Sequence, residues 1–176
     1  MGPIEIVFLV MVALFGIIGI VRGYARELGV TLLLLLALFV LVYLEGTAET
    51  RINAKVLGPL FNLNPDDSKL DVARNLIYCV FLAVIAYASY QGETLAYPGQ
   101  RKSDAFGLVV GLWNGYLLAG SLWCYLDKAH WPLLKVNEQA YSDFYKAAVT
   151  YLPPAIFSWQ HLIALVAILL ILRVWK

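Results

Sequence analysis

The sequence predicts an all-α integral membrane protein, built as a bundle of five transmembrane helices with a short amphipathic surface helix. Its 176 residues are 61% hydrophobic and only 14% charged, and the mean hydropathy is +0.75. Soluble domains carry roughly 25% charged residues, so this composition excludes an ordinary soluble protein. Several apolar runs approach the roughly 20 residues that cross a bilayer core. A net charge of +1, with basic residues scattered over several loops, excludes a nucleic-acid surface.

The first two runs, residues 4–21 and 28–44, predict an antiparallel helical hairpin. Acidic Glu5 precedes the first run and arginines follow it, which is the reverse of a cleaved signal peptide, so we predict a retained helix. The short RGYARE stretch between the runs predicts a tight turn at the membrane surface. Gly23 suits this turn because glycine adopts backbone conformations closed to other residues. Gly19 and Gly23 together predict a small-xxx-small helix contact.

Three further segments surround the central helix in the predicted bundle. Residues 72–90 form the third span, after a polar connection in which residues 47–57 predict a short surface helix. Apolar residues recur at helical spacing within 138–152, opposite charged ones, which predicts an amphipathic helix on the membrane surface. Residues 155–176 form the fifth span. The chain is thus predicted to combine a four-helix membrane domain, 1–154, with one additional C-terminal transmembrane helix.

The fourth span, residues 104–126, is the predicted centre of the bundle. Asp104, or Ser103 before it, accepts hydrogen bonds from the free amides of its first turn. Gly107, Gly111 and Gly115 then recur at four-residue spacing and leave one helix face nearly bare of side chains. Such a face lets another helix approach closely and gain dispersion contacts and weak Cα–H hydrogen bonds.

Charge near the spans predicts the orientation. Arg22, Arg26, Arg101 and Lys102 lie in short loops next to the spans, the position in which basic residues mark the cytoplasmic side. We therefore expect the N-terminus outside and the C-terminus in the cytoplasm.

Polar residues in or beside the spans are the candidate functional groups. Glu5 lies at the edge of the first span, where its carboxylate reaches interfacial water and stabilises the helix N-terminus; an ion or proton pathway is the alternative. Asn114 lies near the middle of the fourth helix and predicts an interhelical hydrogen bond. Arg22 and Glu27 either pair across the turn or face lipid headgroups, with a pathway gate as the alternative. We expect no acid and base to face each other inside the membrane.

His161 is the candidate cofactor ligand. It lies about two turns into the fifth span, where a neutral imidazole is able to ligate haem iron or chlorophyll magnesium. The favoured alternative is an interfacial histidine bonded to a backbone carbonyl or a headgroup. His130 lies far away in a loop, and neither Cys-x-x-Cys nor His-x-x-x-His occurs, so a multi-ligand metal site is not predicted. The sequence therefore predicts no cofactor.

Several of these residues together resemble the colicin V production protein family, the CvpA-type membrane proteins. GIVRGYARELG matches the Arg-Gly turn of that family at Arg22 and Gly23, with Glu27 after it, and SDAFGLVVGLWNG matches its Asp and glycine ladder from Asp104 onward. The resemblance covers about residues 1–154. It implies a four-helix membrane domain and a role in the bacterial envelope, in export or membrane homeostasis, with no settled catalytic activity.

The sequence also departs from the family pattern. The family usually has Asp where Glu5 stands, and Arg where Ala105 and Asn114 stand. By resemblance we expect a bacterial cytoplasmic membrane protein without these two arginines and with an extra fifth helix.

The expected function is that of a non-enzymatic scaffold or assembly protein. It is either an accessory subunit of a larger membrane complex or a self-associating envelope factor, with other membrane subunits and the lipid bilayer as partners. Small-residue helix faces, abundant aromatics and few buried charges favour this interpretation. The alternative is a small oligomeric channel or transporter component. An enzyme is not expected, because no set of groups has the spacing that acid-base or nucleophilic chemistry requires.

Overall fold

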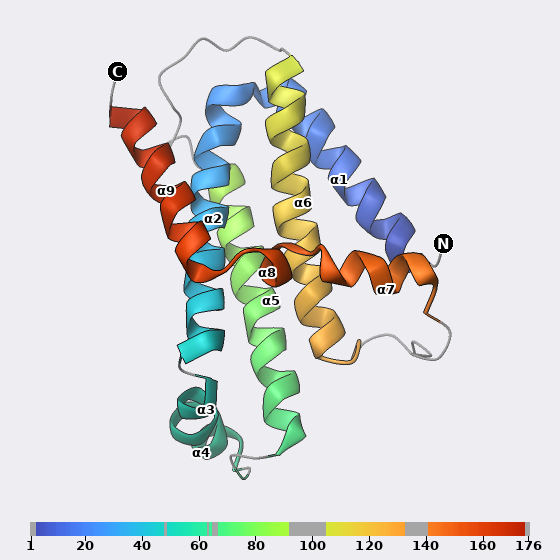
Figure 1. Ribbon diagram of the computed structural model, residues 1–176, viewed down its shortest axis with the longest axis vertical. Helices are drawn as coiled ribbons and strands as arrows, with labels where there is room; N and C mark the ends of the chain where they lie inside the picture. Colours follow the sequence, from blue (N-terminus) through green and yellow to red (C-terminus); the bar gives the residue numbers. More distant parts are fainter. Residues whose placement is uncertain are drawn as a thin grey trace.

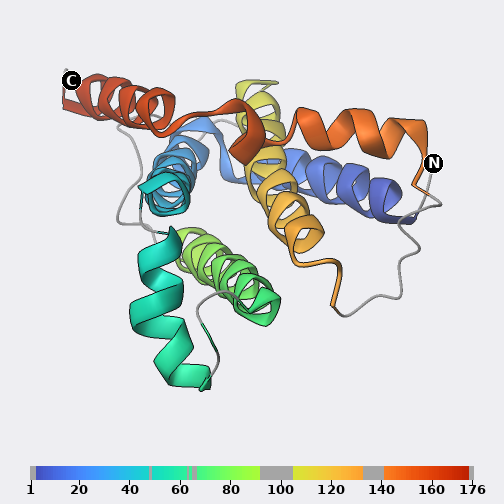
Figure 2. The same cartoon turned by 60° about the horizontal axis from the view of Figure 1, so that its bottom comes forward.

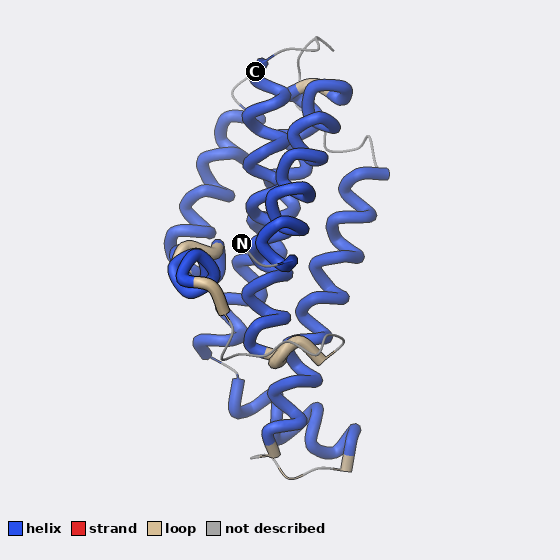
Figure 3. Tube along the Cα trace, turned by 90° about the vertical axis from the view of Figure 1, so that its right-hand side faces the viewer, coloured by secondary structure: helices blue, strands red, loops and turns tan. Residues whose placement is uncertain are grey.

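The computed structural model describes residues 3–47, 49–62, 64, 67–91, 105–132 and 141–174. All regular structure in these residues is helical (Figure 3), in agreement with the predicted all-α class. Within them, four helices are long and apolar enough to cross a membrane, as expected of a multi-pass membrane protein. These helices are α1 (Pro3–Arg22), α2 (Tyr24–Thr47), α5 (Ser68–Gln91) and α6 (Ala105–Lys128).

Shorter helices connect and follow these spans. From residue 49 onward, the predicted surface helix at 47–57 is an irregular helical stretch whose residues 53–57 form a π-helical turn, and Thr47 itself ends α2. Of the predicted amphipathic segment 138–152, the part from residue 141 onward is described. The shorter elements are α3 (Glu49–Ile52), η1 (Asn53–Leu57), α4 (Gly58–Phe61), α7 (Asp143–Thr150), α8 (Pro153–Ile156) and α9 (Trp159–Val174).

Helix α6 lies between the other long helices. It packs against α1, α2, α5 and α8, and Figure 1 shows it with α1 on one side and α2 and α5 on the other. Fully buried leucines from α2, α5 and α6 fill the space between them, among them Leu38, Leu82 and Leu117. The three 24-residue helices therefore form the core of the bundle.

The glycine row of α6 faces α1. A β-carbon at Gly107 would overlap the carbonyl oxygen of Gly19, and one at Gly111 would lie 3.0 Å from the Gly19 Cα. Gly115 lies equally close to the Val12 Cα, where a β-carbon would be 2.9 Å away. The two backbones thus touch without intervening side chains, which maximises dispersion contact in a setting without a hydrophobic force between helices.

Gly23 separates α1 from α2. Its φ of 80° lies in the left-handed region that residues with a β-carbon adopt only at a cost. Its N–H donates to the Gly19 carbonyl at 2.9 Å, and this hydrogen bond closes the last turn of α1. The chain therefore reverses at a single residue.

The fifth predicted span, 155–176, differs from the structure. Pro153 opens the four-residue α8, and Phe157 is extended, with φ −91° and ψ 115°, so the helix stops there. A new helix, α9, begins at Trp159 and has 16 residues, or about 24 Å at about 1.5 Å per residue. It is apolar but shorter than the four spans, and it packs on α2 through the buried side chains of Leu162 and Val166.

The orientation of α7 differs from that of the long helices. It runs crosswise to them about halfway along the bundle in Figure 1, and Figure 2 shows it beside α1 and α6. The described start of α1 lies next to α7, whereas α9 ends at the opposite end of the bundle from α3 and α4.

Candidate functional site

Five polar side chains gather inside the bundle near the turn between α1 and α2. Glu27 and Asn114 have no exposed surface, and Thr31 is also buried. They come from the end of α1, the first two turns of α2, the end of α5 and the middle of α6. This polar cluster consists of Arg22, Glu27, Thr31, Tyr90 and Asn114.

Asn114 joins α6 to α2 through both ends of its amide. Its Nδ2 donates to Oε2 of Glu27 at 2.9 Å and to the Glu27 carbonyl at 3.0 Å. Thr31 Oγ1 lies 2.7 Å from Asn114 Oδ1 and 2.9 Å from the Glu27 carbonyl. The Thr31 hydroxyl thus lies within donor distance of two acceptors, one on α6 and one on its own helix.

Tyr90 and Arg22 complete the surroundings of the Glu27 carboxylate. The Tyr90 hydroxyl donates to Oε2 at 3.0 Å, and the Arg22 guanidinium lies 4.5 Å from the centre of the Tyr90 ring. Arg22 Nε lies 3.6 Å from Oε1 of Glu27. Arg22 and Glu27 thus pair across the turn, which is the first of the two arrangements predicted for them. Because Gly23 turns the chain so tightly, α2 carries its first-turn carboxylate back against the end of α1.

Two atoms of this ion pair have no hydrogen-bond partner. They are Oε1 of Glu27 and Nη1 of Arg22, both buried. The pair is thus held by charge on one side of the carboxylate and by hydrogen bonds on the other. Removing one member of a buried pair leaves the other charge uncompensated, which typically costs about 3–5 kcal/mol.

Glu5 lies in a different environment from the one predicted. Glu5 is 1% exposed rather than open to interfacial water, and Ser142, the N-cap of α7, lies against its carboxylate. The Ser142 hydroxyl donates to the Glu5 carboxylate and accepts from the Tyr145 N–H at 3.0 Å, so Ser142 also caps α7. Glu5 thereby fastens α7 to α1.

Tyr145 anchors the inner face of α7. Its hydroxyl donates to Asp127 at the end of α6 and accepts from Trp131 Nε1 at 2.9 Å, while its ring lies 5.1 Å from that of Trp123. Burial raises the pKa of Tyr145 well above its usual value, and the hydrogen bond to Asp127 raises it further. The hydroxyl therefore stays protonated and available as a donor at neutral pH.

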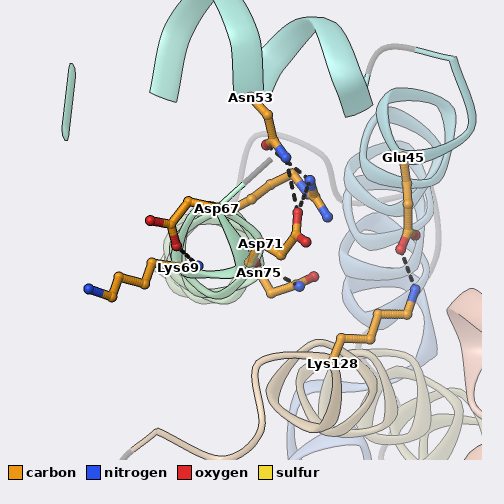
Figure 4. Close-up of polar contacts among 8 residues, drawn as sticks. Glu45, Asn53, Asp67, Lys69, Asp71, Asn75 and Lys128 are labelled. Atoms are coloured by element: carbon orange, nitrogen blue, oxygen red, sulfur yellow. Dashed lines mark hydrogen bonds and ion pairs between the residues drawn. The ribbon is translucent and has the colours of Figure 1, made fainter. Parts of the chain in front are cut away.

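A second polar group lies where η1 meets α5 (Figure 4). Arg74 is buried and its Nη1 donates to Asn53 at 3.0 Å and to Asp71 at 2.9 Å. Asn53 Nδ2 also donates to Asp71 at 3.0 Å. In the same view Glu45 of α2 pairs with Lys128 of α6. The contacts of Arg74, Asn53 and Asp71 join the connection after α2 to α5. The Glu45–Lys128 pair joins the end of α2 to α6.

The remaining predicted residues do not join the polar cluster. His161 is exposed near the start of α9, with its Nδ1 2.9 Å from the Ser158 hydroxyl oxygen. Asp104 lies outside the described residues. Among those that are described, no group of three or more His, Cys, Asp or Glu side chains is placed to hold a metal ion.

Sequence reasoning singled out Arg22, Glu27 and Asn114 but missed Thr31 and Tyr90. Thr31 lies four residues after Glu27, on the same helix face, which is the available sequence signal. Tyr90 is the last residue of the predicted span 72–90, and that position in the sequence does not indicate a polar partner. As a whole, the polar cluster is able to fasten four helices, α1, α2, α5 and α6, to each other from inside. No family model, curated protein or solved structure matches the chain.

Proposed function

We propose that this chain is a non-enzymatic membrane scaffold of the CvpA type, which assembles with other membrane subunits or with itself in a bacterial cytoplasmic membrane. One observation carries the proposal: Glu27 and Asn114, both without exposed surface, are bonded to each other across α2 and α6. The polar groups of the spans thus stabilise the bundle instead of lining a water-filled path. The N-terminus is proposed to lie outside and the C-terminus in the cytoplasm.

The outer faces of the bundle offer the surfaces for assembly. Large apolar side chains are exposed along one side of α1 and along most of α9, for example Val10, Ile17, Ile168 and Ile171. Helix α9 contributes only two buried residues. In the proposed scaffold, α9 is the element that docks another subunit.

The test is extraction of the native protein in a mild detergent, followed by sizing, mass spectrometry of co-purifying chains and an absorption spectrum. A scaffold is expected to elute with partner chains or as a homo-oligomer, and Ile171→Asn on the exposed face of α9 is expected to remove the partners. Val40→Asn, on the exposed part of α2, serves as the matched control. Elution of the wild-type chain as a monomer without partners would contradict the proposal.

A channel or transporter component is the second candidate. The observation that favours it is the buried Arg22–Glu27 pair, in which Glu27 Oε1 and Arg22 Nη1 have no hydrogen-bond partner. Ionisable groups at such positions often belong to ion or proton paths. Reconstituted vesicles would show proton flux that Glu27→Gln abolishes; a scaffold shows no flux with either chain.

A further inference from the structure

Aromatic and charged side chains from three helices lie together at one end of the spans. The Tyr43 ring of α2 lies 5.8 Å from the Trp159 ring at the start of α9, in an edge-on arrangement. Two residues further along α2, Glu45 pairs with Lys128 at the end of α6. These contacts place the ends of α2 and α6 and the beginning of α9 at one level of the bundle.

Helix α7 crosses the bundle close to the same level. Its N-cap, Ser142, bonds to Glu5 at the start of α1, and Tyr145 bonds to Asp127 at the end of α6. Beyond its other end, Pro153 at the start of α8 packs so closely on Gly120 that a β-carbon there would lie 2.7 Å from the proline Cδ. The helix thus lies between the levels of Gly120 and Asp127, crosswise to the spans (Figure 1).

The exposed side chains of α7 and of the residue that follows it are mixed in character. Phe144 and Tyr151 are 44% and 67% exposed, and Lys146, two residues after Phe144, is exposed as well. Helix α1 runs beside α7 (Figure 2), and its exposed apolar side chains include Ile6 and Val7. An aromatic and charged surface that continues an apolar span is the composition found where hydrocarbon meets headgroups.

We propose that the phospholipid headgroup layer of one membrane face lies against α7 and at the level of Tyr43, Asp127 and Trp159. The axial rise from Glu5 to Arg22 in α1 is then about 26 Å, at about 1.5 Å per residue, which is close to the roughly 30 Å of a hydrocarbon core. The opposite face of the membrane lies at the turn that holds Gly23.

This position has a consequence for the connection after α2. Helices α3 and α4, the turn η1 and the start of α5 project beyond the headgroup layer, on the same side as α7. The buried Arg74 and its partners Asn53 and Asp71 then lie outside the hydrocarbon, where an ionic group costs far less.

Site-directed labelling tests the proposal in a chain carrying Cys79→Ala and Cys124→Ala. Single cysteines are introduced as Lys146→Cys in α7, Lys55→Cys in η1 and Ile171→Cys in α9, all at exposed positions. A membrane-impermeant maleimide is expected to label Lys146→Cys and Lys55→Cys from the same side of the membrane, and Ile171→Cys only after detergent is added. Equal labelling of all three in detergent shows that the variants fold alike.

A spin label at Phe144→Cys then separates lipid contact from simple exposure to water. In phosphatidylcholine–phosphatidylglycerol vesicles, we expect it to collide more often with lipid-soluble oxygen than with a water-soluble nickel chelate, and a label at Lys55→Cys to show the opposite order. Three results would overturn the proposal: labelling of Lys146→Cys and Lys55→Cys from opposite sides, protection of Lys146→Cys like Ile171→Cys, or a Phe144→Cys label that meets mainly the chelate.

Discussion

Glu27 shows how a carboxylate is held in the interior of a membrane protein. Tyr90 and Asn114 donate to one oxygen and Arg22 lies 3.6 Å from the other, so charge and hydrogen bonds both compensate the loss of water. The desolvation of two charges often exceeds their attraction, and such a pair adds little net stability compared with apolar residues. The pair instead favours one packing arrangement of the bundle, because α2 must be rotated about its axis so that Glu27 faces α6.

Asn114→Ala tests this arrangement at a single residue. The substitution leaves Oε2 of Glu27 with Tyr90 as its only hydrogen-bond donor and removes an acceptor from Thr31, so we expect a loss of about 1–3 kcal/mol in stability. The midpoint of thermal unfolding in mild detergent, followed by thiol-reactive dye at the internal cysteines, measures it. Exposed Asn64→Ala is the control. An unchanged midpoint for Asn114→Ala would show that the cluster adds nothing to stability.

Tyr145 gives the docking of α7 a defined pH dependence. Its pKa in the folded protein is raised by burial and by the hydrogen bond to Asp127, so folding favours the neutral hydroxyl. The stabilisation is complete below the usual tyrosine pKa of about 10 and is lost as pH rises through the higher folded value. Tryptophan emission from the α7 contact is expected to stay constant between pH 6 and about 10 and to change above that range.

The matched variant is Tyr145→Phe, which keeps the ring tilted against Trp123 but removes the titrating group. Its emission is expected to lack the alkaline transition. A transition of equal size in this variant would assign the effect to another group.

At the scale of elements, the contact between α1 and α6 depends on the absence of β-carbons. Gly111→Leu would place a side chain where the Phe15 carbonyl and the Gly19 Cα lie, so the helices must separate. We expect a loss of roughly 1–3 kcal/mol or more and weakened assembly in mild detergent. Gly46→Leu is the control, since a β-carbon there meets no atom within 4 Å. Equal behaviour of the two variants in size exclusion and thermal unfolding would contradict this role.

The sequence predicted the spans better than their pairing. Hydrophobic runs locate four of the helices within a few residues, and the glycine row of α6 predicts that another helix packs closely against it. The row does not predict that this helix is α1, because the choice depends on which other helix also has small residues at the same depth in the bundle. Gly19 was predicted as a packing residue with Gly23, while in the structure it faces Gly107.

The candidate site was predicted only in part for a similar reason. Asn114 was expected to form an interhelical hydrogen bond, but its partner Glu27 lies 87 residues earlier in the chain. Contacts of that separation depend on the rotation of both helices about their axes, which an apolar sequence with a weak periodicity does not specify. The break before α9 was missed because Pro153 indicates where a helix starts, not that Phe157 will end it.

At the scale of the whole molecule, the described helices differ strongly in how deeply they are embedded. Helices α2, α5 and α6 supply most of the buried core, and α9 adds Leu162 and Val166 to it. We expect the amides of α9 to exchange with deuterium faster than those of α2 and α6 in mild detergent, because local opening of α9 exposes only these two buried side chains. Mass spectrometry of peptides from each helix measures this order. Equal protection would show that α9 is an integral part of the core.

The distance between Glu27 and Asn114 along the chain also matters while the protein is being synthesised. At roughly 5–20 residues per second, a ribosome needs about 4–17 s to reach Asn114 after it has made Glu27. During that interval the hairpin of α1 and α2 has neither its amide partner nor the glycine surface of α6. An insertase or chaperone that shields polar residues in nascent spans would therefore be needed most between these two moments, and translational pausing after α2 would lengthen the exposure.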